Sequence, residues 1–409
     1  MTDPVSSPIR WPLVVVLASL GAVAPVATDL YLPGLPAMGD SLDAGPSAVQ
    51  LTLTAFLVGL ACGQLVMGPL SDHFGRRRPL VASATVCVAA GVVCALAPTL
   101  PVLLAGRLLQ GFAGAGGMVI GRAVIADLVT GRAAAKAFTL MITVGGVAPV
   151  LAPLAGSLLA DPVGWRGMLW TVTGLCAVML AGVLLVLPET HPVEARAVHR
   201  EASPLGGVRT VLGLRAYRSQ IAVSALSFAV LMAYISSSPF VYQDVVGLSE
   251  VQYGVAFGLN AMGLIGSGWI ASRLIDRWTP SQVLRAAVSV QLAAVLTYVV
   301  LAAAGAPAWT FPLPIFFAVA SNGGIMGNSA ALAMSMVRPV AGAGSAVLGF
   351  STFAVGALVS PLVGLGGEDS ALVPALVMAS ACALSFTLTR LGASSDAQSS
   401  SSSSVTATS

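Results

Sequence analysis

Twelve apolar stretches follow one another along the chain, each long enough to cross the roughly 30 Å hydrocarbon core of a bilayer as a helix. Short polar turns separate most of them. The pattern predicts an all-α membrane protein with twelve transmembrane helices. The predicted spans lie near residues 11–33, 47–70, 80–98, 101–126, 136–160, 166–187, 217–241, 251–271, 281–304, 309–330, 342–364 and 370–390.

One long polar connection divides these spans into two sets of six. Asp72 and Asp276 stand 204 residues apart, each in the loop after the second span of its set. The spacing predicts two pseudo-symmetric six-helix bundles, a construction found in secondary transporters. The predicted parts are an N-terminal bundle over 1–187, a cytoplasmic linker over 188–216, a C-terminal bundle over 217–392 and a disordered Ser-rich cytoplasmic tail over 393–409.

The composition agrees with a membrane protein. Hydrophobic residues make up 56% of the chain and charged residues only 9%, whereas about a quarter of the residues in soluble proteins are charged. Most basic residues lie at alternate ends of the predicted spans, which places both termini in the cytoplasm by the positive-inside rule. The net charge of +3 suggests no nucleic-acid partner.

The five cysteines all lie inside predicted helices, and none belongs to a CxxC pair. We interpret them as packing residues without a disulfide or metal role. The three histidines fall in predicted cytoplasmic loops, which leaves no histidine-based metal or proton site within the membrane. No cofactor is expected.

A short loop after the second span carries an acid and a run of arginines between two glycines. Three consecutive arginines beginning with Arg76 and Arg77 hold this loop outside the hydrocarbon. Gly68 and Gly75 permit close packing and a tight turn. A generic stop signal would also contain basic residues, but the added Asp72 and the glycines make a gating loop the more specific interpretation.

Two charged side chains fall within predicted spans. Asp29 lies near the outer end of the first span, and Arg107 lies about 9 Å into the fourth. An intramembrane charge is a candidate functional group, so we expect both, with their neighbours Tyr31 and Gln110, to form a proton-coupling or substrate site. The alternatives are a solvated acid at a helix end and a purely structural ion pair.

The fifth, seventh and eighth spans carry polar or helix-bending residues. In the fifth span, two prolines four residues apart are flanked by glycines, which suits a helix that rocks against a partner, although a static kink would also fit. In the seventh and eighth spans, the candidates line a substrate cavity, with an interfacial aromatic belt as the alternative for Tyr242. These residues are Gly145, Pro149, Pro153 and Gly156 in the fifth span, Tyr234, Ser238 and Phe240 in the seventh, and Asn260 in the eighth.

An ordered set of segments between about residues 25 and 365 resembles the bicyclomycin/chloramphenicol resistance (Bcr/CflA) family of drug:proton antiporters, within the major facilitator superfamily. His73 and Ala148 depart from the usual basic residue and glycine of two of these motifs. The matching segments are 28–33, 68–78, 107–111, 145–156, 238–243, 246–249, 257–260, 343–346 and 348–350.

The resemblance implies the major facilitator fold and export of a small drug, such as an amphenicol like chloramphenicol, in exchange for protons. Asp29 would then alternate between proton and substrate, Arg107 would tune it, and Asp72 with Arg76 would latch the cytoplasmic gate. The implied partners are the drug, protons and the lipid bilayer. The implied protein is a monomer in a bacterial inner membrane.

Proton-coupled uptake of a sugar or another metabolite on the same fold is the main alternative, against which the antiporter-like fifth span argues. An enzyme is not expected, because the chain has no HExxH and no Gly-x-Ser-x-Gly sequence. An ATP-driven pump is not expected either, since no GxxxxGK[ST] loop is present.

Overall fold

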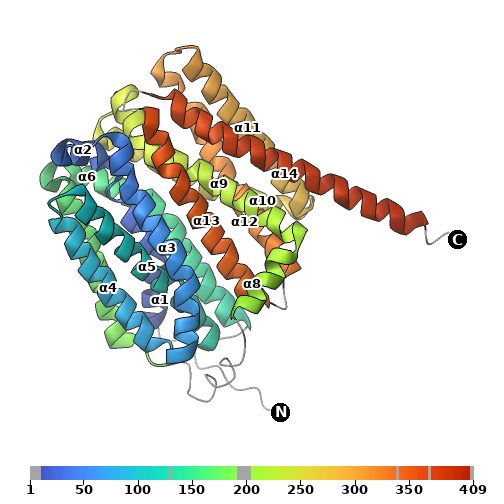
Figure 1. The fold of residues 1–409 in the computed structure, drawn as a ribbon, viewed down its shortest axis with the longest axis horizontal. Helices are drawn as coiled ribbons and strands as arrows, with labels where there is room; N and C mark the ends of the chain where they lie inside the picture. Colours follow the sequence, from blue (N-terminus) through green and yellow to red (C-terminus); the bar gives the residue numbers. More distant parts are fainter. Residues whose placement is uncertain (1–10, 129–130, 191–203, 338–339, 367–369, 406–409) are drawn as a thin grey trace. The chain divides into compact units, whose positions relative to one another are not determined.

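The computed structural model describes residues 11–128, 131–190, 204–337, 340–366 and 370–405, and all regular structure in these residues is helical (Figure 1). The first helices are α1 (Trp11–Asp29), η1 (Leu32–Gly34), α2 (Leu35–Leu42), α3 (Pro46–Phe74), α4 (Arg77–Leu96), α5 (Leu100–Leu128) and α6 (Gly131–Val186). The later ones are α8 (Pro204–Gly213), α9 (Arg215–Pro239), η2 (Phe240–Val245), α10 (Glu250–Leu274), α11 (Pro280–Ala303), η3 (Ala308–Thr310), α12 (Pro312–Met336), α13 (Ala341–Val363), η5 (Gly364–Gly366) and α14 (Leu372–Val405).

Eleven helical segments in the described residues are long and apolar enough to cross a membrane. One of them, Val147–Val186, has 40 residues, about 60 Å of helix, which is twice the thickness of the hydrocarbon core. Gly164 interrupts it with a φ of 62°. The fifth and sixth predicted spans therefore lie on either side of Gly164, and the prediction of twelve transmembrane helices is confirmed.

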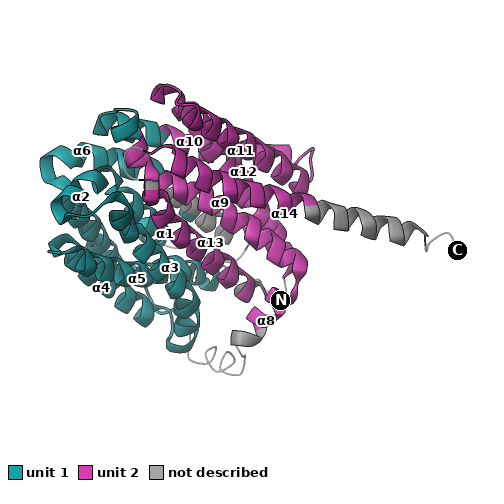
Figure 2. Cartoon of the chain, turned by 45° about the horizontal axis from the view of Figure 1, so that its top comes forward, with its two compact units in different colours: residues 1–204, 242–258 teal, residues 205–241, 259–409 magenta. Residues whose placement is uncertain are grey.

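The chain forms two compact units (Figure 2). Unit 1 contains residues 1–204 and 242–258, and unit 2 contains 205–241 and 259–409. The predicted boundaries of bundles, linker and tail stay a prediction. Part of the predicted linker lies outside the described residues, and so do the side chains of the predicted tail.

The two units repeat the same helix pairs. In unit 1, α1 packs on α5 and α6, and α4 packs on the same two helices. In unit 2, α9 packs on α12 and α13, while α11 packs on α12 and α14. This repetition is the pseudo-symmetry that the spacing of the loops predicted.

Individual contacts fix the register of the repeat. Cys87 on α4 donates from its Sγ to the carbonyl of Gln110 on α5, and Gln291 on α11 donates from Nε2 to the carbonyl of Ala318 on α12. The equivalent positions are 204 residues apart on α4 and α11, and 208 apart on α5 and α12. Ser83 against Gly116, repeated as Ala287 against Gly324, gives the same two offsets.

Glycines allow α3 and α5 to approach at backbone distance. A Cβ added to Gly111 of α5 would collide with the carbonyl oxygen of Phe56, and one added to Gly59 of α3 would collide with that of Leu108. Neither neighbour is a flexible side chain that could move aside. This close approach brings α3 side chains next to Arg107.

We expect Gly111→Ala to destabilise the protein by about 1–3 kcal/mol, because overpacking against a rigid backbone exceeds the gain in helix propensity. The measurement is the thermal unfolding midpoint of the purified protein in detergent, followed by tryptophan fluorescence. Gly114→Ala on the same helix is the matched control, since its Cβ would meet only Val23 Cγ1 at 3.7 Å. Equal midpoints for the two variants would contradict the expectation.

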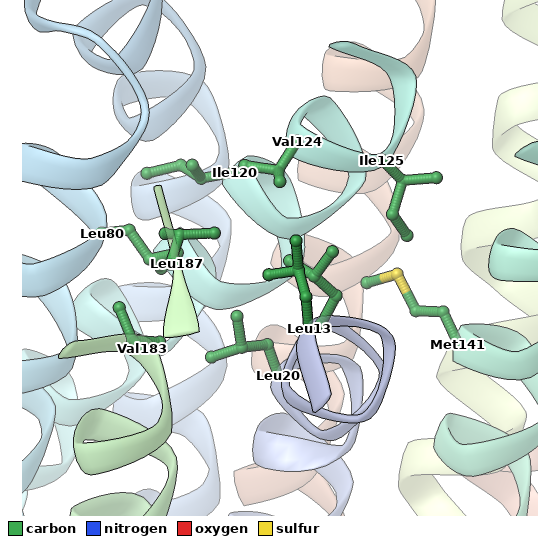
Figure 3. Close-up of a cluster of buried hydrophobic side chains, with 10 residues drawn as sticks. Leu13, Leu20, Leu80, Ile120, Val124, Ile125, Met141, Val183 and Leu187 are labelled. Carbon is green, nitrogen blue, oxygen red and sulfur yellow. The ribbon is translucent and has the colours of Figure 1, made fainter. Parts of the chain in front are cut away.

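A cluster of buried apolar side chains joins α1, α4, α5 and α6 at one end of unit 1 (Figure 3). Leu80 contributes from the first turn of α4, Val124 and Ile125 from the last turns of α5, and Leu187 from the end of α6. The cluster therefore gathers the helix ends at or next to which Arg76, Asp127 and Glu189 lie. Its other members are Leu13, Leu17, Leu20, Ile120, Met141 and Val183.

Candidate functional site

Asp29 is the last residue of α1, and the chain turns directly after it into η1 and α2. Pro33 is the second residue of η1, where the chain bends. The carboxyl group of Asp29 is buried, with 3% of the residue exposed. The hydroxyl of Thr28 lies 2.8 Å from Asp29 Oδ1 and also within hydrogen-bonding distance of the carbonyls of Ala24 (3.0 Å) and Pro25 (3.1 Å).

Arg107 is fully buried on α5, in contact with α1 and α3. Its guanidinium donates to the carbonyl of Ala27 (2.9 Å), to Gln110 Oε1 (2.7 Å) and, more weakly, to the hydroxyl of Tyr31 (3.5 Å). Its Cζ lies 4.7 Å from the centre of the Tyr31 ring and 4.5 Å from that of Phe56. Neutral acceptors and two aromatic faces therefore stabilise this buried cation.

The structure thus brings Tyr31, Arg107 and Gln110 into contact, and Arg107 holds α1 two residues before Asp29. Tyr31 also shares a hydrogen bond with Thr52 of α3, at 2.9 Å between the oxygens. The described residues contain no ion pair between Asp29 and Arg107. The alternative of a structural ion pair therefore does not describe this arrangement, and the functional roles of these residues remain a prediction.

Two cavities of unit 1 lie near these helices, and neither is lined by Asp29 or Arg107. An apolar groove of about 390 Å³ runs between α1 and α6 and is lined by Ala22, Val26, Leu30 and residues of α6. A smaller cavity of about 20 Å³ lies among α1, α4, α5 and α6.

Unit 2 repeats the packing around this site without its charges. Val23 lies against Gly114, and the equivalent pair is Ser227 with Asn322, whose hydroxyl and Oδ1 are 2.5 Å apart. The same offsets of 204 and 208 residues match Asp29 with Ala233 and Arg107 with Ile315, both of which are buried. At these two matched positions unit 2 therefore has apolar side chains in place of charged ones.

The residues predicted to line a substrate cavity are buried on α9, η2 and α10 of the chain. Asn260 donates from Nδ2 to the hydroxyl of Tyr234 at 2.9 Å. Ser238 donates to the carbonyl of Ile235 at 3.1 Å, which fits a serine that satisfies backbone near a proline. Phe240 is buried. Tyr242 is buried too, with its ring centre 6.3 Å from that of Tyr253, so an interfacial belt does not describe it.

Three of the four predicted residues of the fifth span can be placed. Pro149 and Pro153 lie inside α6, and Gly156 faces the backbone directly after α1, where an added Cβ would collide with the carbonyl oxygen of Leu30. Gly156 therefore lets α6 approach the residue that follows Asp29. The surroundings of Gly145 lie outside what the structure describes.

The loop residues form one ionic network around Arg76. Its guanidinium donates to Asp72 Oδ1 (2.5 Å), to Asp127 Oδ2 (2.9 Å) and to the hydroxyl of Ser71 (2.8 Å). Burial disfavours the charged form, but hydrogen bonds and opposite charges from Asp127 and Asp72 outweigh it and raise the pKa of Arg76 above its usual value. The Arg76 guanidinium therefore stays charged across physiological pH.

Gly75 turns the chain into α4 with a φ of 88°, as expected for a glycine in a tight turn. Gly68 does not need to be glycine for packing, since an added Cβ would meet its nearest neighbour, Val119 Cγ1, at an ordinary 3.7 Å. Arg77 donates from its side chain to the carbonyl of Leu184 at 3.2 Å.

Sequence reasoning missed two acids of this network. Asp127 binds the Arg76 side chain, and Glu189 accepts from the backbone N–H groups of Arg76 (2.8 Å) and Arg77 (3.3 Å). Glu189 thereby binds the first turn of α4, where orphan N–H groups attract a carboxylate. Asp127 and Glu189 follow predicted spans at the end where most charged residues are basic. This exception to the charge pattern could have identified them.

We expect Asp127→Asn to lower the stability of the protein by about 1–3 kcal/mol, because the Arg76 guanidinium loses one of its two charged acceptors. The thermal unfolding midpoint measures the effect. Asp276→Asn is the control, since Asp276 is exposed in the loop of unit 2 that corresponds to the Asp72 loop. A midpoint for Asp127→Asn equal to that of the control would show that the network contributes nothing measurable.

Comparison with known proteins identifies the family. The sequence profile of the Major Facilitator Superfamily matches residues 17–361. The MFS-type transporter YdgK of Bacillus subtilis is 32% identical over 374 residues, which cover 91% of this chain and 93% of that protein. The bicyclomycin resistance protein homolog of Haemophilus influenzae is 28% identical, over 90% of this chain and 92% of that protein.

A solved structure supports the fold. The crystal structure of a D-xylose-proton symporter superposes with a TM-score of 0.72 at 14% sequence identity, and the match covers 93% of this chain and 98% of that one. At this identity the likeness concerns the fold alone. The chain is therefore a membrane transporter and not an enzyme, and it belongs to the major facilitator superfamily, where its relatives place it with the bicyclomycin/chloramphenicol resistance (Bcr/CflA) family.

Proposed function

We propose that the protein exports small drugs, such as chloramphenicol-like amphenicols, in exchange for protons. The observation that carries this proposal is the buried Asp29 beside the Thr28 hydroxyl, next to the backbone that Arg107 holds. The protein acts as a monomer in the inner membrane of a bacterium, with both termini in the cytoplasm. Its partners are the drug, protons and the lipid bilayer.

The Thr28 hydroxyl can satisfy Asp29 in both protonation states. A hydroxyl has one proton, so it donates to only one of its three neighbouring acceptors at a time. When Asp29 is ionised, the hydroxyl donates to the carboxylate at 2.8 Å. When Asp29 is protonated, the acid donates to the Thr28 oxygen, and the hydroxyl donates to the carbonyl of Ala24 or Pro25. Rotation of one hydroxyl group therefore accompanies the gain or loss of a proton.

Arg107 binds the carbonyl of Ala27, two residues before Asp29, and no ion pair joins it to the acid in the described residues. Burial favours the neutral form of a carboxyl group, whereas water favours the ionised form. A change in hydration during the transport cycle can then shift the balance between the two states. The matched positions in unit 2 hold Ala233 and Ile315, which cannot carry a proton.

Two pairs of buried polar side chains in unit 2 are uncharged. Tyr234 with Asn260, and Ser227 with Asn322, offer hydroxyl and amide groups. Such groups bind a substrate with hydroxyl, amide or nitro groups without requiring it to carry charge. This supports a neutral, moderately polar drug as the exported molecule.

A susceptibility panel in an efflux-deficient bacterial host tests the proposal. Expression should raise the inhibitory concentration of at least one amphenicol or similar small drug, and a protonophore should remove the protection. Accumulation of labelled sugars in the same cells tests the alternative of metabolite uptake. Proton-dependent sugar accumulation without any drug resistance would overturn drug export.

We expect Thr28→Val to slow proton-coupled transport by about tenfold, because the ionised form of Asp29 loses a charge-assisted hydrogen bond. Valine keeps the shape of threonine, which isolates the hydroxyl. The rate is measured in proteoliposomes with an imposed pH gradient and the drug found by the panel. Thr28→Ser is the control and should keep most of the activity. Equal rates for the two variants would contradict a role for the hydroxyl.

A further inference from the structure

Two cysteines from different helices meet inside unit 1. Cys87 of α4 and Cys176 in the second helical part of α6 are both buried, and their sulfur atoms lie 3.8 Å apart. Both are free thiols. They had been expected only to fill space between helices, which would not require two sulfur atoms to meet.

Cys87, Cys176 and Met179 line the same small cavity. The cavity of about 20 Å³ is bounded by Cys87, Cys176 and Met179, with apolar and small residues around them. Met179 follows Cys176 by three residues on the same helix and therefore shares its face. A space of roughly 10–15 Å³ already admits one water-sized atom, so the cavity can hold a single metal ion.

Both sulfurs lie close enough to bind the same ion. With the zinc–sulfur bond length of about 2.3 Å as a guide, a separation of 3.8 Å corresponds to a sulfur–metal–sulfur angle of about 110°. That angle leaves room for a third ligand, and Met179 is available to supply it. Thiolate and thioether ligands select soft ions such as Cu(I).

Gln110 connects the Cys87 thiol to the Arg107 guanidinium. The backbone carbonyl of Gln110 accepts from the Cys87 thiol at 3.9 Å, and the side chain of the same residue accepts from Arg107 at 2.7 Å. The thiolate is the form of cysteine that binds metals.

We propose that Cys87, Cys176 and Met179 form a binding site for one soft monovalent metal ion, of the class of Ag⁺ and Cu⁺. On binding, one thiol loses its proton and forms a metal–sulfur bond, while the other two sulfurs donate lone pairs. One cation enters and one proton leaves, so the net charge of the site is unchanged. No oxidant or reductant takes part.

Silver binding to the purified full-length protein tests this site. Cys62, Cys94 and Cys382 are replaced by serine, which leaves Cys87 and Cys176 as the only thiols. The protein in detergent is loaded with Ag⁺ under nitrogen and passed through a desalting column in the presence of excess free methionine as competitor. We expect one Ag⁺ retained per chain, one proton released per ion in a weakly buffered solution, and X-ray absorption showing three sulfur ligands.

Three further variants assign the ligands. Cys87→Ala and Cys176→Ala, each in the same background, should weaken retention of Ag⁺ at least about tenfold. Met179→Leu keeps the apolar volume and should lower the number of sulfur ligands from three to two. Gel filtration and the thermal unfolding midpoint identify the variants that fold, and any folded single variant is sufficient for the comparison.

The proposal is overturned if the background protein retains no Ag⁺ against methionine, or if the folded cysteine variants retain as much as the background. Three sulfur ligands persisting in Met179→Leu would exclude Met179 as the third ligand. These readouts measure binding alone, so they are independent of the drug or the direction of transport.

Discussion

Asp29→Asn should reduce drug efflux to the level of vesicles that lack the protein. Asparagine has the size of aspartate and can still accept a hydrogen bond from Thr28, so the end of α1 should keep its conformation. The amide cannot exchange a proton in the accessible pH range. If the proton gradient drives export through Asp29, the driving force is lost while the fold is retained.

Two transport measurements separate coupling from folding. Efflux driven by an imposed pH gradient should vanish in Asp29→Asn, whereas exchange of labelled for unlabelled drug across the membrane, without a gradient, should persist. Asp40→Asn is the matched control, since Asp40 is an exposed acid on the neighbouring α2. Gradient-driven efflux by Asp29→Asn at the rate of the control would refute the proposed proton carrier.

Arg107→Lys should inactivate the transporter and destabilise it, although the substitution keeps the positive charge. The planar guanidinium donates at once to Ala27 and Gln110 and lies against the rings of Tyr31 and Phe56. A lysine ammonium is a compact charge that cannot reproduce this fork or the stacking. Loss of one charged hydrogen bond and part of the aromatic contact costs about 2–4 kcal/mol.

The thermal unfolding midpoint and the efflux rate measure the two parts of this effect. Arg122→Lys is the control on the same helix, because Arg122 is exposed and donates from Nε to the carbonyl of Met118. We expect the control to behave like the unmodified protein in both assays. Normal efflux by Arg107→Lys would show that only charge is needed at this position, and the fork geometry would then have no functional role.

The number of helices and the repeat could be predicted because a bilayer imposes strong local constraints. Each crossing requires a long apolar segment, and three consecutive arginines cannot lie in hydrocarbon. The fifth and sixth spans both lie within α6, and the single residue Gly164 interrupts that helix between them. These features depend on short stretches of sequence and on the solvent around them.

The partners of the intramembrane charges could not be predicted in the same way. Sequence depth placed Asp29 and Arg107 at a similar level, and an ion pair was one expected outcome. In the folded chain, Arg107 instead binds the carbonyl of Ala27, and Asp29 binds the hydroxyl of Thr28. Which neutral group satisfies a buried charge depends on the rotation of α1 against α5, and small residues such as Gly111 set that approach.

By itself, the sequence determined that this chain crosses the membrane repeatedly as two related bundles, and its ordered motifs identified the family. Only the tertiary structure brought Asp127 and Glu189 to Arg76, and Cys176 to Cys87. The physical reason is the range of the interactions. Hydrophobicity and turn formation act between neighbours in the chain, whereas hydrogen bonds and sulfur contacts act over a few ångströms between residues that are 51 to 113 positions apart.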